Sequence, residues 1–252
     1  FPRLAARTMN FRLGQPRAFT VSPDGQRVLF LRSLTGTSRA HALWVYDTAR
    51  GTERVVADPA ALLGGDTEDL TVAERARRER MRITTSGIVA FSTDTSVQTV
   101  AFALSSRLFV VDLTSDTPAR EYPTQASVVD PQLDPTGARV AYAGDRALHV
   151  VSLESGSDSV VVAPDPDDPA EVVWGRAEFV ASEELDRARG FWWAPDGRSL
   201  LVERYDESPV RVWHISDPAF PAREPARMRY PQAGTPNALV SLSVVSLDGG
   251  RV

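Results

Sequence analysis

The stretch AFTVSPDGQRVLFL, residues 18–31, contains the repeating unit on which the fold prediction depends. Two short runs rich in strand-forming residues, 18–21 and 27–31, flank the turn Ser22-Pro23-Asp24-Gly25. Proline presets the first dihedral angle of such a turn and glycine tolerates positive φ, so these residues predict a β-hairpin. A second hairpin is predicted over residues 42–56. Four short strands joined by tight turns are the content of one β-propeller blade.

The same unit recurs along the chain, which indicates a repeat architecture. The turn returns at Asp134–Gly137 and Ala194–Gly197, and in degraded form at Thr93–Ser96. The third strand of the unit returns at Leu108–Asp112, Leu148–Ser152 and Val210–His214. Leu108 and Leu148 lie 40 residues apart, the period expected of a four-stranded blade. We therefore predict an all-β fold of about four propeller blades, with the run 239–245 opening a further blade.

Composition excludes several kinds of partner and cofactor. The net charge of -5 argues against a nucleic-acid surface, and no run approaches the roughly 20 apolar residues that span a bilayer. The chain has no cysteine, and its three histidines lie far apart, so disulfides and zinc or histidine metal clusters are not expected. The 252 residues could form one large domain or two small ones. We expect no cofactor, no metal and no membrane or nucleic-acid partner.

The spacing between third strands is longer than one blade in two places, which predicts two insertions. The first, residues 67–81, is expected to be a short solvated helix, capped by Thr67 or Thr71, with acidic residues leading and arginines trailing. The second, residues 164–187, begins as an acidic, proline-rich loop and ends on the pair Glu183-Glu184. An insertion that leaves a blade and ends in two carboxylates is placed to build a binding site.

Glu183 and Glu184 are the best candidates for a functional site. Neighbouring carboxylates repel each other, so a fold that holds them together usually expects a cation. One interpretation is two exposed glutamates without a ligand. The other is capture of a primary ammonium group by charge-assisted hydrogen bonds, with the ligand between side chains that diverge by about 100° on a helix. General acid–base use would require facing carboxylates rather than adjacent ones.

Other polar residues carry less information. Arg187 is predicted to form a local ion pair with Asp186, and one ring of Trp192-Trp193 is predicted to lie in the core. Arg82 is a lone arginine at a strand entrance. The chain has neither a GxSxG nucleophile elbow nor a glycine-rich phosphate loop, so we identify no catalytic residue in it.

These stretches resemble the dipeptidyl peptidase IV family of serine peptidases, and most closely its cytosolic branch. The segment 183–187, EELDR, followed by GFWWAP at 190–195, is similar to the family's double-glutamate motif. Residues 206–210 and 229–237 resemble its DES-x-V and RYP segments. The stretch RITTSGIVAF from Arg82 resembles the one preceding the family's GI-x-SY, although Phe91-Ser92 replaces tyrosine and aspartate. The similarity runs from residue 79 onward, and the first 78 residues fit only as generic propeller.

The resemblance implies a larger protein with an eight-bladed propeller and a C-terminal α/β-hydrolase domain that carries a Ser-Asp-His triad. That domain is absent from residues 1–252, so this segment alone is not expected to cleave peptides. The parent would remove dipeptides from peptide N-termini, favouring proline or alanine as the second residue. Glu183 and Glu184 would bind the free amino terminus, and Arg82 is the nearest match to the family arginine that binds a substrate carbonyl or carboxylate. A cytoplasmic homodimer is implied.

Two alternatives to this function remain open at the sequence level. The first is a non-catalytic propeller that binds proteins, because the Ser22–Gly25 turn fits such propellers equally well. The second is a related oligopeptidase or acylaminoacyl peptidase that keeps the insertion of residues 164–187. A GxSxG motif further along the parent gene would eliminate the first alternative and leave the second.

Overall fold

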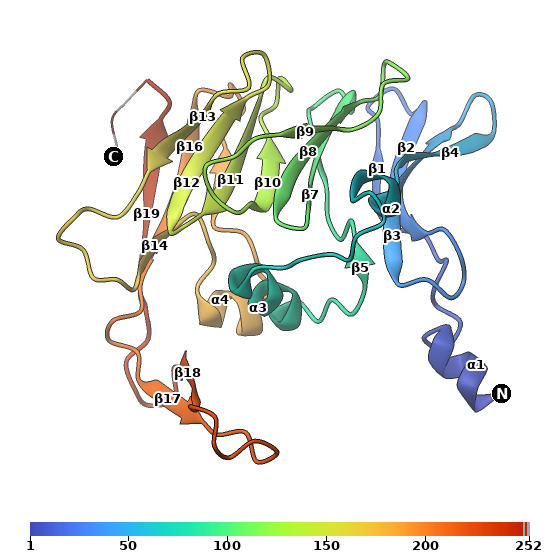
Figure 1. The fold of residues 1–252 in the computed structure, drawn as a ribbon. Helices are drawn as coiled ribbons and strands as arrows, with labels where there is room; N and C mark the ends of the chain where they lie inside the picture. The colour runs from blue at the N-terminus through green and yellow to red at the C-terminus, as the bar shows by residue number, and fades with distance from the viewer. Residues whose placement is uncertain (249, 251–252) are drawn as a thin grey trace. The chain divides into compact units, whose positions relative to one another are not determined.

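The computed structural model describes residues 1–248 and 250, and it is built mainly of antiparallel strands, which confirms the all-β prediction (Figure 1). Within these residues every helix is too short or too polar to cross a membrane. The chain divides into two compact units. The first contains Phe1–Asp145, His149–Val160 and Pro195–Gly197, and the second contains Arg146–Leu148, Val161–Ala194 and the described residues from Arg198 onward.

Consecutive strands pair in order, as predicted, in the first part of the chain. After helix α1 (Pro2–Arg7), the first sheet contains β1 (Arg17–Val21), β2 (Arg27–Ser33), β3 (Ala40–Asp47) and β4 (Thr52–Ala57), with β5 (Ser86–Gly87) parallel to β3. The second sheet contains β6 (Ser92–Thr93), β7 (Thr99–Leu104), β8 (Arg107–Asp112) and β9 (Arg120–Tyr122). The third contains β10 (Val129–Leu133), β11 (Arg139–Gly144), β12 (Ala147–Ser152) and β13 (Asp158–Val162). The third strands predicted at Leu108 and Leu148 are therefore confirmed.

The sheet of the second unit is arranged differently from the prediction. Its central strand, β16 (Ser199–Asp206), pairs on one edge with β14 (Val172–Trp174) and β15 (Phe191–Trp193) in succession. The other edge pairs with β19 (Leu239–Ser246) along the full length of both strands.

Two strand predictions are wrong as a result. Residues 210–214 are not the third strand of this sheet, because β17 (Val212–Ile215) forms a separate hairpin with β18 (Ala226–Arg229). The run at 239–245 does not open a further blade, because β19 occupies the edge of β16 that a third strand takes. A short alternating run looks the same in an inserted hairpin and in a blade, so the local pattern alone misassigned both.

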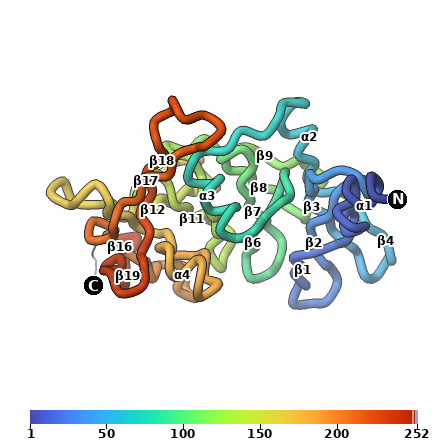
Figure 2. Tube along the Cα trace, turned by 90° about the horizontal axis from the view of Figure 1, so that it is seen from below, coloured from blue at the N-terminus to red at the C-terminus, as the bar shows by residue number. Residues whose placement is uncertain are grey.

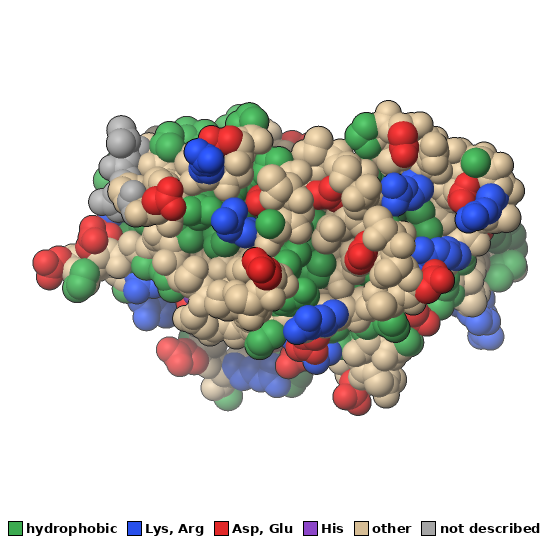
Figure 3. Space-filling model, turned by 90° about the horizontal axis from the view of Figure 1, so that it is seen from above, with side chains coloured by type: hydrophobic (Ala, Val, Ile, Leu, Met, Phe, Trp, Pro, Cys, Tyr) green, Lys and Arg blue, Asp and Glu red, His purple; other side chains and the backbone are tan. Residues whose placement is uncertain are grey.

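Apolar side chains on facing sheets of the first unit interdigitate in two cores. Between the first and second sheets, the buried residues include Leu29, Leu31, Val100 and Phe102. Between the second and third sheets, a second cluster is formed by Leu108, Tyr142 and their neighbours. On the outside, the face in Figure 3 carries acidic and basic side chains interspersed with one another, as on an ordinary solvated surface.

The turn between first and second strands repeats with one geometry. In all four turns the first N–H donates to the carbonyl five residues later, the first residues being Ser22, Asp94, Asp134 and Ala194. The fourth residue has a positive φ of 55° to 74°, and these residues are Gly25, Val97, Gly137 and Gly197. The degraded turn is therefore Asp94–Val97, one residue later than predicted. The Asp94 carboxylate accepts from the N–H groups of Ser96, Gln98 and Thr99, which closes this turn without glycine.

Within the first unit the turns that contain Asp94, Asp134 and Gly197 stack on one another. The N–H of Thr95 donates to the carbonyl of Pro135 at 3.1 Å. A Cβ on Gly137 would lie 3.1 Å from Cβ of Asp94, and a Cβ on Gly197 would lie 3.2 Å from Oδ2 of Asp134. Glycine is thus required at these positions for two reasons: the backbone has a positive φ, and the neighbouring turn approaches too closely for a side chain.

Helix α3 (Val72–Arg80) replaces the predicted helix of residues 67–81, and Thr71 rather than Thr67 caps it by accepting from the N–H of Glu74. It lies beside the β7–β8 end of the second sheet, where Ser105 accepts from the N–H of Asp69 (Figure 2). The expectation of a purely solvated helix is wrong, because Glu74 and Arg78 are buried. Arg78 donates to Glu74 at 2.8 Å and to Glu68 at 2.6 Å.

His41 lies in β3 where β5 crosses close to it. A Cβ on Gly87 would lie 2.7 Å from the carbonyl oxygen of His41. The imidazole of His41 is only 4% exposed, and its Nδ1 has no hydrogen-bond partner among the described residues. Burial, with a smaller contribution from the charge of Arg17, lowers the pKa of His41 from 6.5 to about 4. The helix α2 (Pro59–Leu62), which Asp58 caps, packs against the same strand.

The stacking of the turns predicts unequal effects of two alanine substitutions. Gly25 and Gly137 have similar positive φ values of 68° and 74°, but only at Gly137 would an added methyl group meet other atoms within 4 Å. Both Gly25→Ala and Gly137→Ala should lose about 1 kcal/mol of unfolding free energy from the left-handed backbone. Gly137→Ala should lose about 1 kcal/mol more from crowding against Asp94. Denaturant unfolding of both variants tests this, and equal losses would show that the turns do not press on each other.

The buried His41 predicts a pH dependence of stability. Its pKa is lower in the folded chain than the ordinary 6.5, so between pH 6.5 and about 4 the unfolded state binds more protons. This contribution to stability is complete above pH 6.5 and is lost as the pH falls toward 4. His41→Gln should flatten the fall in thermal midpoint across this window, whereas His214→Gln, at an exposed histidine, should leave the slope unchanged. Identical slopes in wild type and His41→Gln would contradict this assignment.

Candidate functional site

Glu183 and Glu184 lie in the last turn of α4 (Phe179–Glu184), and both side chains are exposed. Adjacent positions on a helix point about 100° apart, so the carboxylates diverge. In the part of the chain that the structure describes, neither carboxylate makes a hydrogen bond or an ion pair. The pair is therefore an open, uncompensated patch of negative charge at the end of a short helix.

The arm that carries α4 leaves the sheet through a narrow neck. β14 and β15 pair with consecutive stretches of the same edge of β16, and residues 175–190 form the arm between them. A bridge between Arg176 and Arg189 closes the neck. A Cβ on Gly190 would lie only 2.3 Å from the backbone of Arg176, so this position requires glycine. The arm is shorter than the predicted insertion of residues 164–187, because β14 belongs to the sheet.

The first turn of α4 is fixed by Glu178, which is 7% exposed. Its carboxylate accepts from the N–H groups of Val180 and Ala181, both at 2.6 Å. Its carbonyl accepts from the hydroxyl of Ser182 at 2.8 Å. A negative charge at a helix N-terminus is favourable, because it satisfies free N–H groups and complements the helix dipole.

The end of α4 is fixed by Arg187, but not in the way predicted. The guanidinium donates to the carboxylate of Glu203 in β16 and, at 2.8 Å, to the carbonyl of Arg189. The N–H of Arg187 donates to the carbonyl of Ala181 at 2.9 Å. The predicted local ion pair with Asp186 is wrong, because Asp186 takes a left-handed φ of 51° and the guanidinium reaches back into the sheet.

Glu203 is fully buried and receives bonds from both sides of α4. Its Oε1 accepts from the N–H of Glu178 at 3.3 Å, and its Oε2 accepts from Arg187. Burial raises the pKa of Glu203, and the hydrogen bond and charge of Arg187 only partly offset this. Sequence reasoning missed both Glu203 and Glu178. The available signals were a lone carboxylate inside the strand run SLLVERYD and an acidic residue immediately before a helix.

Aromatic side chains support the arm in two places, next to strand β15 and next to the β17–β18 hairpin. Phe191 is fully buried, while Trp192 is half-buried with the guanidinium of Arg187 5.9 Å from its ring centre. The ring of Phe179, the first residue of α4, meets Tyr230 edge-on at 5.3 Å. The segment around Tyr230 is held in turn by an ion pair of 2.5 Å between Arg229 and Glu171.

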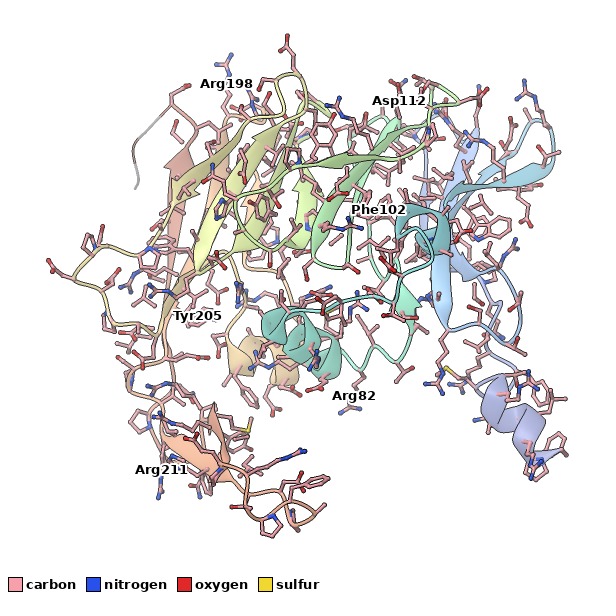
Figure 4. All side chains as sticks on the ribbon, viewed as in Figure 1. Arg82, Phe102, Asp112, Arg198, Tyr205 and Arg211 are labelled. Atoms are coloured by element: carbon pink, nitrogen blue, oxygen red, sulfur yellow. The ribbon has the colours of Figure 1, made fainter. Side chains whose placement is uncertain are left out.

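Arg82 belongs to the first unit, whereas the glutamate pair belongs to the second. It follows α3, has a φ of 53°, and its N–H donates to the carbonyl of Glu79. Its side chain is exposed and extends away from α3 (Figure 4). A cavity of about 630 Å³ borders α3 and is lined by Pro59, Leu63, Arg78 and Ile83 among others, but not by Arg82.

The helix before Arg82 is anchored by charge. Burial tends to lower the pKa of Arg78, but its bonds to Glu68 and Glu74 outweigh burial and raise it. Glu68 also accepts from the N–H of Gly87 at 3.0 Å, which ties the segment after Arg82 to the same network. Arg82 is therefore an exposed cation on a backbone that is fixed on both sides.

The arrangement suits binding of a cation and not acid–base catalysis. Two exposed carboxylates on adjacent helical positions can each accept a hydrogen bond from one ammonium group placed between them. They do not face each other, as a general acid and base would. Residues 1–248 and 250 contain no group of three or more His, Asp or Glu side chains arranged to hold a metal ion.

Comparison with known proteins identifies the family of most of the chain. The family model described as dipeptidyl peptidase IV (DPP IV) N-terminal region matches residues 85–252. Dipeptidyl peptidase 8 of Mus musculus and of Homo sapiens are each 26% identical to the chain over 91% of its length, and the aligned part is 30% and 29% of those proteins. The venom dipeptidyl peptidase 4 of Apis mellifera is 36% identical over 38% of the chain.

A solved structure has the same fold. The crystal structure of Porphyromonas gingivalis dipeptidyl peptidase 4 aligns with the whole chain at a TM-score of 0.69 and 17% identity, over 34% of its own length. The chain thus spans about a third of the length of the relatives it matches.

Proposed function

The chain belongs to the dipeptidyl peptidase IV N-terminal region family, and on that basis we propose that it is the substrate-admitting propeller region of a serine dipeptidyl peptidase. In this proposal the parent protein removes X-Pro or X-Ala dipeptides from peptide N-termini. Its catalytic triad lies in an α/β-hydrolase domain outside residues 1–252, and the parent is a cytoplasmic homodimer.

The observation that carries the proposal is the uncompensated glutamate pair on an anchored helix. Glu183 and Glu184 have no partner among the described residues, and the helix that presents them is bonded to the sheet at both ends. A free α-amino group carries one positive charge and three N–H donors, so it can satisfy both carboxylates at once. If the amino group is held at a fixed place, the peptide bond that follows the second residue is the one that reaches the catalytic triad.

Arg82 is proposed to bind a carbonyl or carboxylate oxygen of a peptide substrate. It is exposed and has no side-chain partner in the described part of the chain, so its five N–H donors are available. A guanidinium can bind a planar oxygen pair in a bidentate manner, which a lysine cannot. The buried ion network of α3 supports this role, because it fixes the backbone from which Arg82 extends.

The proposal predicts strict selectivity for a free amino terminus in the full-length protein. The Gly-Pro chromogenic amide should be cleaved, and its N-acetylated version should not. Glu183→Gln and Glu184→Gln should each lower kcat/KM for the free amine roughly 10- to 100-fold, because each removes a charge-assisted hydrogen bond of about 1.5–3 kcal/mol. Steady-state kinetics on both substrates give the measurement.

Glu154→Gln, at an exposed glutamate of the first unit, is the matched control and should change nothing. Equal cleavage of the free and acetylated amides would refute the proposal in favour of an oligopeptidase or acylaminoacyl peptidase. Cleavage of neither would favour a non-catalytic binding propeller.

A further inference from the structure

We propose that Arg187 and Glu203 are positioning residues that set the direction in which α4 presents Glu183 and Glu184. The inference rests on the proposed role of the pair in binding an amino group. It concerns residues that touch no substrate themselves and act through the helix between them.

Helix α4 cannot hold its own position. It has six residues, whereas isolated helices shorter than about 12 residues are marginal in water. Ala181 is its only buried residue, and apart from the edge-on contact of Phe179 with Tyr230 little apolar packing anchors it. The polar bonds at its two ends are therefore needed to fix its direction.

Both ends converge on the single carboxylate of Glu203. The N–H of Glu178, at the start of the helix, donates to Oε1, and the guanidinium of Arg187, just past its end, donates to Oε2. The backbone of Glu203 is itself fixed at the neck of the arm, since its carbonyl accepts from Gly175 and its N–H donates to Gly190. One buried side chain in the central strand thus holds the start and the end of α4 relative to the sheet.

The same contact keeps Arg187 away from the pair it positions. Arg187 lies three positions after Glu184 in the sequence, within the reach of a long flexible side chain. Bound to Glu203 and to the carbonyl of Arg189, its guanidinium leaves both exposed carboxylates without a cation. If Glu203 were lost, Arg187 would be free to neutralise the pair and compete with the substrate's ammonium group.

Removing both charges separates positioning from stability. Arg187→Met alone leaves the buried carboxylate of Glu203 without its cation and should lower the thermal midpoint. The double variant Arg187→Met/Glu203→Gln removes the cation and the charge together, so its thermal midpoint should return close to that of the wild type. Its inhibition constant for the free dipeptide Gly-Pro should nevertheless rise at least about tenfold, because the end of α4 that carries Glu183 and Glu184 is no longer bonded to β16. Arg187→Lys, which keeps the charge but cannot bridge Glu203 and the Arg189 carbonyl in the same way, should give an intermediate inhibition constant.

The experiment uses the full-length protein, with Arg227→Met as a control at an exposed arginine of the second unit. Glu183→Gln and Glu184→Gln are measured beside the double variant. If they weaken Gly-Pro binding and the double variant does not, the positioning role is refuted while the role of the pair stands. If they leave Gly-Pro binding unchanged, the proposed function fails and the positioning role fails with it. Weakened binding in all of them, with Arg227→Met unchanged, supports both.

Discussion

The buried carboxylate of Glu203 is the constraint on which the candidate site depends. A charge without water contact must be compensated by hydrogen bonds and a cation, and in this chain the compensation comes from Glu178 and Arg187. Satisfying that one group draws the two ends of α4 to the central strand of a sheet. The exposed glutamates therefore lie on a short helix whose position is determined by its bonds to Glu203, and not by its own helix propensity.

The sheets provide the fixed frame that such a contact needs. In the first unit, glycine-bearing turns stack on the aspartates of neighbouring turns, and the facing sheets share dense apolar cores. In the second unit, β16 is paired on both edges, so Glu203 extends from a strand with little freedom to move. Binding residues placed on inserted segments above such a frame keep their geometry while the segments themselves remain exposed.

Local chemistry decided which features could be read from the sequence. The hairpins around Ser22–Gly25 and Asp134–Gly137 were predictable because proline and glycine act within four residues. The pairing of β19 with β16 was not, since it joins segments separated by the whole β17–β18 hairpin. The glutamate pair could be identified as a candidate because neighbouring carboxylates repel each other and attract a cation. The partner of Arg187 could not, because Glu203 lies 16 residues away and only the fold brings the two together.

The most direct test of the glutamate pair's role is a crystal structure of the full-length protein with a slowly cleaved peptide that has a free amino terminus. If the pair binds the amino terminus, the amino nitrogen should lie within about 3 Å of a carboxylate oxygen of both Glu183 and Glu184. Arg187 should stay on Glu203 when the peptide is bound. An amino group that lies in solvent, or against other side chains with the glutamate pair unoccupied, would contradict the central claim.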